Sequence, residues 1–345
     1  MQTLIKIIEK LAEIPSVSGK ESGKRLMLSF PSLSKASVDE CGNVILRKEG
    51  YGKKKQTILF EAHMDTIGLC VEEILENGFL SVLPCGGIDH SILPGTEMTI
   101  WGKIPCKAVA VSIPPHLKAV STASNEKRFC LVDTGLKSKS KALKWISAGD
   151  VGSFCRPIRY LANSRISASY WDNRCSVATL LLAIERFESV YHDVIFLFSV
   201  GEETTSRGVR VFCQKHSPDC AVILDAGFGT KPGENLSKCI VMGAGPSVSF
   251  TDTLSFSMTK WIQNVAKTNR QPLQTVAEPG GTGTSATALQ TENGGIPSAV
   301  ISIPIMNMHT PAEICDLRDI ESTARLVSLL ADSEIIPRKE QIILE

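Results

Sequence analysis

Two kinds of hydrophobic pattern alternate along most of the chain. Short runs that are apolar on both faces predict buried strands at 57–62, 193–200, 220–224 and 298–304. Apolar positions at helical spacing, with polar residues between them, predict helices at 2–13, 175–187, 206–215, 254–268 and 317–333. This alternation predicts an α/β fold in which helices cover both faces of a mostly parallel sheet, a three-layer α/β/α arrangement.

The pattern changes between residues 69 and 162. This stretch contains short apolar runs separated by Gly, Pro, Asn and Ser, with little helical periodicity. Many short strands joined by turns are typical of a small barrel or sandwich. We therefore expect a small β-barrel-like domain at 69–162, inserted into a catalytic domain formed by residues 1–68 and 163–345.

Residues with metal-binding or acid–base side chains stand where the predicted strands end, and one more begins the helix after the inserted domain. They are His63, Asp65, Glu202, Glu203, Asp225, His309 and Asp172. Strands of one sheet bring such ends together although they are far apart in the sequence. Histidine and carboxylate ligands without a thiolate are typical of a catalytic dinuclear site for zinc, cobalt or manganese.

A dinuclear site needs about two protein ligands for each metal ion and one bridging carboxylate. We expect His63 and Asp225 to hold one divalent ion. Glu203 and His309 would hold the other, and Asp172 would bridge the two. Zinc is the ion that this ligand set favours, with cobalt and manganese as alternatives.

Two carboxylates remain after this assignment. Glu202 is free to act as the general base that takes a proton from a metal-activated water. Asp65 lies two residues after His63, so on a strand the two side chains would point the same way. Asp65 would then orient the imidazole of His63, as carboxylates beside metal-bound histidines do.

Each of these residues also has a purely structural interpretation. Asp172 could be a favourable charge at a helix N-terminus. Asp225 could cap a helix or turn, and Glu202 and Glu203 could belong to a solvated turn. The joint occurrence of these residues at strand ends of one fold pattern favours a site.

Composition excludes several function classes. Hydrophobic residues make up 43% and charged residues 21%, with a net charge of +1, so nothing indicates a nucleic-acid partner. No run of about 18 apolar residues occurs, so we expect no membrane helix and no membrane partner. The eleven cysteines include no Cys-x-x-Cys pair, which predicts a reducing, cytoplasmic location.

The motifs together resemble those of one family. Ala62-His63-Met64-Asp65, Asp172-Asn173-Arg174, Gly201-Glu202-Glu203, Asp225 and Met308-His309-Thr310-Pro311-Ala312-Glu313 are similar to the glutamyl/deblocking aminopeptidases. That family includes the tetrahedral aminopeptidases and relatives that carry the name endoglucanase. The resemblance covers essentially the whole chain and implies a metallopeptidase-like catalytic domain.

The resemblance also implies an activity and an assembly. The expected enzyme is a metal-dependent aminopeptidase that removes N-terminal residues from peptides, with the ligands named above and Glu202 as base. The expected assembly is a homo-oligomer built from dimers, up to a hollow tetrahedral dodecamer, which the inserted domain helps to hold together. A related dinuclear-zinc carboxypeptidase or deacylase is one alternative function, and a glycoside hydrolase with two catalytic carboxylates is another.

One position departs from the family pattern. The family usually carries Thr-Asp-Ala in a Gly-rich turn before its last histidine, and here the triplet is Thr284-Ser285-Ala286. A carboxylate near the substrate is therefore missing, and Ser285 is a candidate for substrate positioning. His90 and His116, which have no second ligand type nearby, are interpreted as loop or interface residues.

Overall fold

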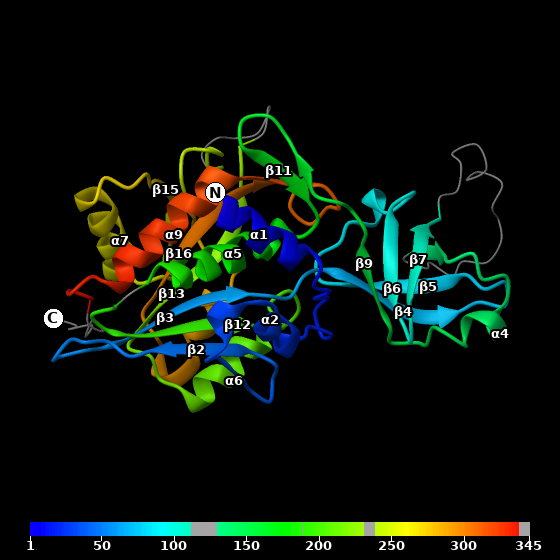
Figure 1. Ribbon diagram of the computed structural model, residues 1–345, viewed down its shortest axis with the longest axis horizontal. Coiled ribbons are helices and arrows are strands. Elements are labelled where there is room, and N and C mark those ends of the chain that lie inside the picture. The colour runs from blue at the N-terminus through cyan, green and yellow to red at the C-terminus, as the bar shows by residue number, and fades with distance from the viewer. Residues whose placement is uncertain (112–129, 188, 231–238, 338–345) are drawn as a thin grey trace.

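The computed structural model describes residues 1–111, 130–187, 189–230 and 239–337. Within them, a sheet of eleven strands forms the centre of a large body, and a closed six-stranded barrel extends from one end of it (Figure 1). These two parts confirm the predicted α/β fold and its barrel-like insert.

The large sheet has the strand order β1-β2-β12-β3-β13-β16-β17-β11-β10. Its strands are β1 (Ser37–Val38), β2 (Val44–Lys48), β12 (Asp193–Ser199), β3 (Thr57–His63), β13 (Cys220–Phe228), β16 (Ser298–Met306), β17 (Glu313–Asp316), β11 (Arg165–Ala168) and β10 (Arg159–Tyr160). Off this path, β14 (Ser247–Phe250) pairs with β16 and with β15 (Gln274–Ala277).

The central strands β12, β3, β13 and β16 run parallel, whereas β1, β2, β17, β11 and β10 join the sheet in antiparallel pairs. The prediction of a mostly parallel sheet is therefore correct at the centre and wrong at the edges. The central strands are buried on both faces, which gives the continuous apolar runs that a sequence reveals. The edge strands are two to five residues long and lack such runs.

Helices cover both faces of the sheet. One face packs against α1 (Gln2–Ala12), α2 (Gly23–Ser29), α5 (Trp171–Arg186), α7 (Phe256–Thr268) and α9 (Leu317–Ala331). The other face packs against α6 (Arg207–Lys215) and α8 (Ala286–Leu289). On β3, Ile58, Phe60 and Ala62 point into the first core, and Leu59 points into the second. This alternation produces the three layers that the sequence predicted.

The barrel has the strand order β4-β5-β8-β7-β6-β9 and its own hydrophobic core. Its elements are β4 (Gly68–Ile74), β5 (Leu80–Cys85), β6 (Glu97–Trp101), β7 (Pro105–Ala110), β8 (Cys130–Asp133), β9 (Val151–Phe154) and the short helix α4 (Lys139–Ala142). Strand β10 falls inside the predicted insert but pairs with the large sheet. The domain boundaries at 69 and 162 stay a prediction.

Three short 3-10 helices, η1 (Pro31–Leu33), η2 (His90–Ile92) and η4 (Glu292–Gly294), complete the described elements. No helix in the part of the chain that the structure describes has both the length and the apolar character that a membrane crossing requires.

Candidate metal centre

The predicted site residues come from separate elements of the large body. His63 is the last residue of β3, and Asp225 lies on the neighbouring strand β13. Asp172 lies at the start of α5, where its φ and ψ of −78° and 106° depart from helical values. The turn after β12 and the loop between β16 and β17 add the rest of the set, Glu202, Glu203 and His309.

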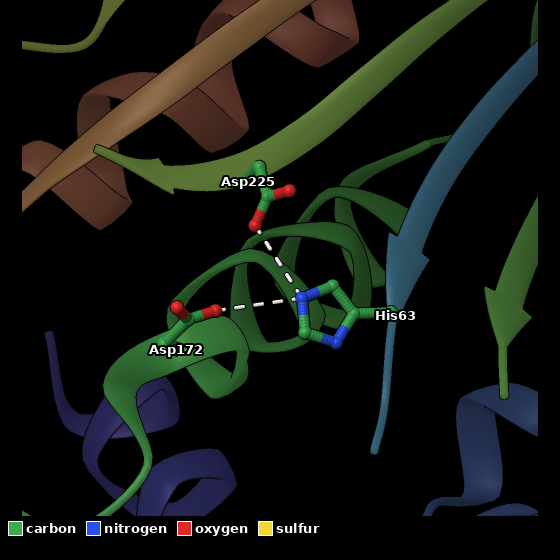
Figure 2. Close-up of side chains that lie close together, drawn as sticks. All are labelled: His63, Asp172 and Asp225. Carbon is green, nitrogen blue, oxygen red and sulfur yellow. Dashed lines mark ion pairs between the residues drawn. The ribbon is translucent and has the colours of Figure 1, made fainter. Parts of the chain in front are cut away.

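The first group of side chains is His63, Asp172 and Asp225, all buried (Figure 2). Nε2 of His63 lies 3.4 Å from Oδ1 of Asp172 and 3.4 Å from Oδ1 of Asp225. Nδ1 of His63 donates a hydrogen bond of 3.0 Å to the backbone carbonyl of Asp65. That bond places a proton on Nδ1 and fixes the orientation of the ring. The other ring nitrogen, Nε2, faces the two carboxylates.

The second group is Asp172, Glu203 and His309. Nε2 of His309 lies 3.3 Å from Oδ2 of Asp172 and 3.5 Å from Oε2 of Glu203. Its Nδ1 donates to the carbonyl of Gly87 at 2.8 Å, a contact with the loop after β5. Asp172 therefore turns one oxygen toward each histidine, as a carboxylate shared between two cation sites must.

The spacing of these atoms fits divalent ions. Two ligand atoms, each about 2.1 Å from an ion at a tetrahedral angle, lie about 3.4 Å apart. The nitrogen-to-oxygen distances in both groups are 3.3 to 3.5 Å. In addition, Oε1 of Glu203 is buried and has no hydrogen-bond partner among the residues that the structure describes. Nitrogen and oxygen donors without sulfur suit zinc, cobalt or manganese.

The electrostatics of the cluster also favour a cation. Burial raises the pKa of Glu203 to about 10, and the nearby charge of Asp172 adds to the shift. Burial would raise the pKa of Asp172 as well, but hydrogen bonds from His309 and His63 outweigh it and hold this pKa well below its usual range. Burial lowers the pKa of His63, yet its carboxylate neighbours raise it well above 6.5 overall. Negative charge thus exceeds what the two imidazoles can balance.

Glu202 stands beside both groups and belongs to neither. Its Oε2 lies 4.0 Å from Nε2 of His63, and burial raises its pKa to about 8. The side chain of Glu202 is 13% exposed, so it borders solvent, whereas that of Glu203 is 5% exposed. Oε2 of Glu202 approaches His63 and Oε2 of Glu203 approaches His309, so the two neighbouring side chains diverge.

Asp65 contacts both His63 and the turn after β12. Its carboxylate lies 3.6 Å from Nδ1 of His63, and its backbone carbonyl accepts the hydrogen bond from that nitrogen. The carboxylate oxygens also accept hydrogen bonds from the backbone N–H of Glu202 at 3.0 Å and of Glu203 at 3.2 Å. Strand β3 ends at His63, so the expected alternation of a strand does not extend to Asp65. The role of Asp65 in orienting the imidazole of His63 stays a prediction.

Glu313 holds the centre together and had no role assigned from the sequence. Its Oε2 accepts from the backbone N–H of Asp172 at 3.0 Å, and its Oε1 accepts from that of His309 at 2.7 Å. His309 has a φ of +61°, a costly conformation for a residue other than glycine, and this bond helps to hold it. Its place four residues after His309 was the one available signal.

Ser285 belongs to neither of the two groups. It is 1% exposed, and its Oγ donates to Oε1 of Glu61 at 3.2 Å. Ser199 donates to the same oxygen at 2.5 Å, and burial raises the pKa of Glu61 to about 7. Substrate positioning by Ser285 stays a prediction, and the structure places a carboxylate, Glu61, next to the position where the family pattern has one.

Two other predictions concern histidines outside the cluster. His90 lies on η2 with its side chain 74% exposed, far less enclosed than the site histidines. His116 lies outside the described residues.

The family model of the M42 glutamyl aminopeptidases matches residues 42–326 of this chain. The chain belongs to the M42 glutamyl aminopeptidase family. This assignment confirms the resemblance and the prediction of an enzyme that hydrolyses peptide bonds, an aminopeptidase. M42 aminopeptidases depend on metal ions, and the two groups of side chains above supply donors that could hold them.

Individual M42 proteins resemble the chain over nearly its whole length. Lysyl aminopeptidase of Pyrococcus furiosus is 29% identical over 335 residues, covering 94% of this chain and 96% of that protein. An aminopeptidase structure from Desulfurococcus kamchatkensis matches with a TM-score of 0.90, 27% identity and 99% coverage of both chains. The TET1 peptidase of Pyrococcus horikoshii, which can assemble into a tetrahedron or a large octahedral shell, matches with a TM-score of 0.82 and 27% identity, covering 95% of this chain and 99% of that one.

Proposed function

We propose that the chain removes N-terminal residues from peptides with two divalent metal ions and Glu202 as the general base. The observation that carries this proposal is the pair of donor groups that share Asp172, with Glu202 beside both. His63, Asp172 and Asp225 would hold one ion. Asp172, Glu203 and His309 would hold the other, with zinc the expected metal.

The bound ions would lower the pKa of a water molecule and polarise the scissile carbonyl. The residues of the chain supply the proton transfers. Oε2 of Glu202 accepts the proton of the attacking water and later delivers it to the leaving amine. Asp65 fixes the position of this base, because its carboxylate accepts both backbone N–H groups of the Glu202–Glu203 turn.

The preference for a free N-terminus would come from the amine itself. A free amine can bind a divalent ion held by these residues or pair with a carboxylate of the cluster. A blocked amine can do neither. This supports an aminopeptidase over a deacylase or a carboxypeptidase with the same ligand chemistry.

We also propose that the enzyme works as a homo-oligomer in the cytoplasm. The tetrahedral and octahedral assemblies of the Pyrococcus horikoshii relative support an assembly of this kind. None of the eleven cysteines forms a disulfide bond, which supports a reducing compartment. A dimer as the building block and a dodecamer as the final size are the finer parts of this proposal.

A panel of aminoacyl chromogenic amides tests the activity. The panel includes an N-acetylated member and is assayed before chelation, after chelation, and after zinc, cobalt or manganese is restored. We expect hydrolysis of free-amine substrates only, loss on chelation and recovery with a divalent ion. Hydrolysis of the acetylated member at a similar rate would favour a deacylase, and activity that survives complete chelation would contradict the metal mechanism.

A further inference from the structure

A groove of about 480 Å³ lies between the barrel and the loop that carries His309. One wall is the segment from Ile92 to Glu97, which follows η2 and begins β6. A second wall is formed by residues 155–159 after β9, and a third by residues 310–312 after His309. The groove therefore lies where the barrel meets the large body.

Two of these walls begin at the metal centre. His309 immediately precedes the wall formed by residues 310–312, and Gly87 lies five residues before Ile92. The hydrogen bond from Nδ1 of His309 to the carbonyl of Gly87 joins the two segments at the site. The groove and the metal centre are therefore joined by the same two chain segments.

The groove carries positive charge that is not neutralised. Arg156 and Arg159 line it, and in the part of the chain that the structure describes neither has a hydrogen bond or an ion pair with its side chain. Lys107 adds a cation, with Nζ 3.0 Å from Sγ of Cys155 in the second wall. Glu97 is the acidic residue of the lining.

We propose that this groove binds a carboxylate of the peptide substrate, chiefly the C-terminal carboxylate of a short peptide. The inference rests on the proposed function, because it needs the free amine to lie at the carboxylate cluster. A short peptide is a dipole with an amine at one end and a carboxylate at the other. The metal centre holds the amine end and the arginine groove attracts the carboxylate end, so the two sites together set the orientation of the peptide.

The distance between His309 and the groove limits the length of the peptide. The third wall extends only three residues beyond His309, which is at most about 10 Å of extended chain. An extended peptide advances about 3.3 to 3.6 Å per residue, so peptides of about two to four residues would bring their C-terminus into the groove. In a longer peptide, an acidic side chain at the same distance would take its place.

Matched peptides test the inference. Peptides of two to six residues that all share the same N-terminal residue are prepared as C-terminal acids and as C-terminal amides. A further amidated set carries an acidic side chain at position three or four. For the wild-type enzyme we expect kcat/KM to be about fivefold higher for short acids than for their amides, because the acids have a lower KM. A larger ratio is not expected, since an exposed charge pair contributes only about 1 kcal/mol or less, which corresponds to about fivefold. The amidated acidic peptides distinguish a side-chain carboxylate from the C-terminal one.

Variants assign the effect to the groove. In R156Q/R159Q we expect the acid-to-amide ratio to fall to about one, with unchanged turnover of an aminoacyl chromogenic amide, which has no carboxylate. R156K/R159K should restore part of the ratio. R165Q is the matched control, because Arg165 lies on β11 near this sheet edge and does not line the groove.

The outcomes separate the two proposals. If the wild-type enzyme does not hydrolyse the chromogenic amide, the proposed function fails and this inference fails with it. If that substrate is hydrolysed but short acids and amides react equally, the inference alone is overturned. An acid-to-amide ratio that survives in R156Q/R159Q, or that falls equally in R165Q, also overturns it.

Discussion

Glu202 and Glu203 are adjacent in sequence, yet they enter different interactions. Glu203 is the more buried of the two and faces Nε2 of His309 at 3.5 Å. Glu202 borders solvent and lies outside both ligand groups. One backbone turn, held by Asp65, thus carries the proposed ligand and the proposed base at neighbouring positions.

Replacing the base tests this division. Glu202→Gln should retain both metal ions, because Glu202 belongs to neither donor group. Turnover should fall by about 10²- to 10⁴-fold, the usual contribution of a general base. Metal content is measured by elemental analysis and turnover with a chromogenic amide. Near-normal activity, or the loss of metal from this variant, would contradict the assignment.

A second residue-scale prediction concerns Glu313. Its two oxygens hold the backbone N–H groups of Asp172 and His309, and glutamine can offer only one acceptor in that place. Glu313→Gln should weaken metal affinity by about 10- to 100-fold, as losses beside a ligand set do. The affinity is measured by titrating zinc into enzyme from which a chelator has removed the metal. Glu321→Gln on α9, which removes an ion pair with Arg186 away from the centre, should leave the affinity unchanged.

At the scale of elements, the segment before β12 depends on a neutral histidine. Nδ1 of His192 accepts a hydrogen bond from the N–H of Gln56 at 2.9 Å, and Nε2 donates to the carbonyl of Glu334 at 3.2 Å. This pattern requires one proton on the ring. Burial lowers the pKa of His192 below 6.5, in agreement with its exposure of 2%.

The sign of the pH effect follows from that shift. The unfolded chain takes up a proton on His192 near pH 6.5 and the folded chain only at lower pH, so protonation favours unfolding. The contribution of His192 to stability is complete above pH 6.5 and is lost as the pH falls through the folded pKa. The free energy of unfolding, measured with urea, should therefore fall more between pH 7 and pH 5 for the wild type than for His192→Gln. His90→Gln, on the exposed η2, should follow the wild type, and equal pH slopes for all three would contradict this role.

The sequence predicts the central elements well because their patterns are continuous. Helix α1 was expected at 2–13 and spans Gln2–Ala12, and β12 was expected at 193–200 and spans Asp193–Ser199. Strand β13 was expected to end at 224 but continues to Phe228, because pairing with β16 extends across Asp225 and Gly227. Strand β17 was not expected, since its buried residues include Glu313 and Asp316, which a hydrophobic pattern cannot reveal.

The same reasoning applies to the site. Residues that carry characteristic chemistry at strand ends, such as His63 and Glu203, are visible in a sequence. Hydrogen bonds from distant backbone N–H groups, such as those that Asp65 and Glu313 accept, are not visible, because they depend on how distant segments pack. The neighbourhood of Ser285 and Glu61 likewise joins positions 224 residues apart.

At the scale of the whole molecule, the barrel carries an exposed apolar patch of Ile104, Leu143 and Trp145. Their side chains are 46%, 50% and 40% exposed, and the N–H of Lys103 donates to the carbonyl of Trp145 at 2.8 Å, which brings the segment of Ile104 next to that of Leu143 and Trp145. Exposed apolar patches often mark contacts between proteins. The patch is a candidate contact for the proposed homo-oligomer.

Light scattering after size-exclusion chromatography tests that contact. Trp145→Glu should lower the molar mass of the assembly, because a charge would replace an apolar contact. Leu28→Glu on α2, where the side chain is 72% exposed, is the control and should leave the mass unchanged. An unaltered mass for Trp145→Glu, or an equal loss for both variants, would contradict an interface at this patch.

The barrel contacts the metal centre at several points, and this limits how the enzyme can be redesigned. Strand β4 begins three residues after Asp65, and the carbonyl of Gly87 accepts the bond from His309. The N–H of Phe154 donates to the hydroxyl of Tyr170 at 2.5 Å, two residues before Asp172. Excision of the insert to obtain a minimal peptidase would remove partners of both ligand groups. A smaller catalyst made by shortening this chain at the barrel would therefore need new supports for His309 and Asp172 in the large body.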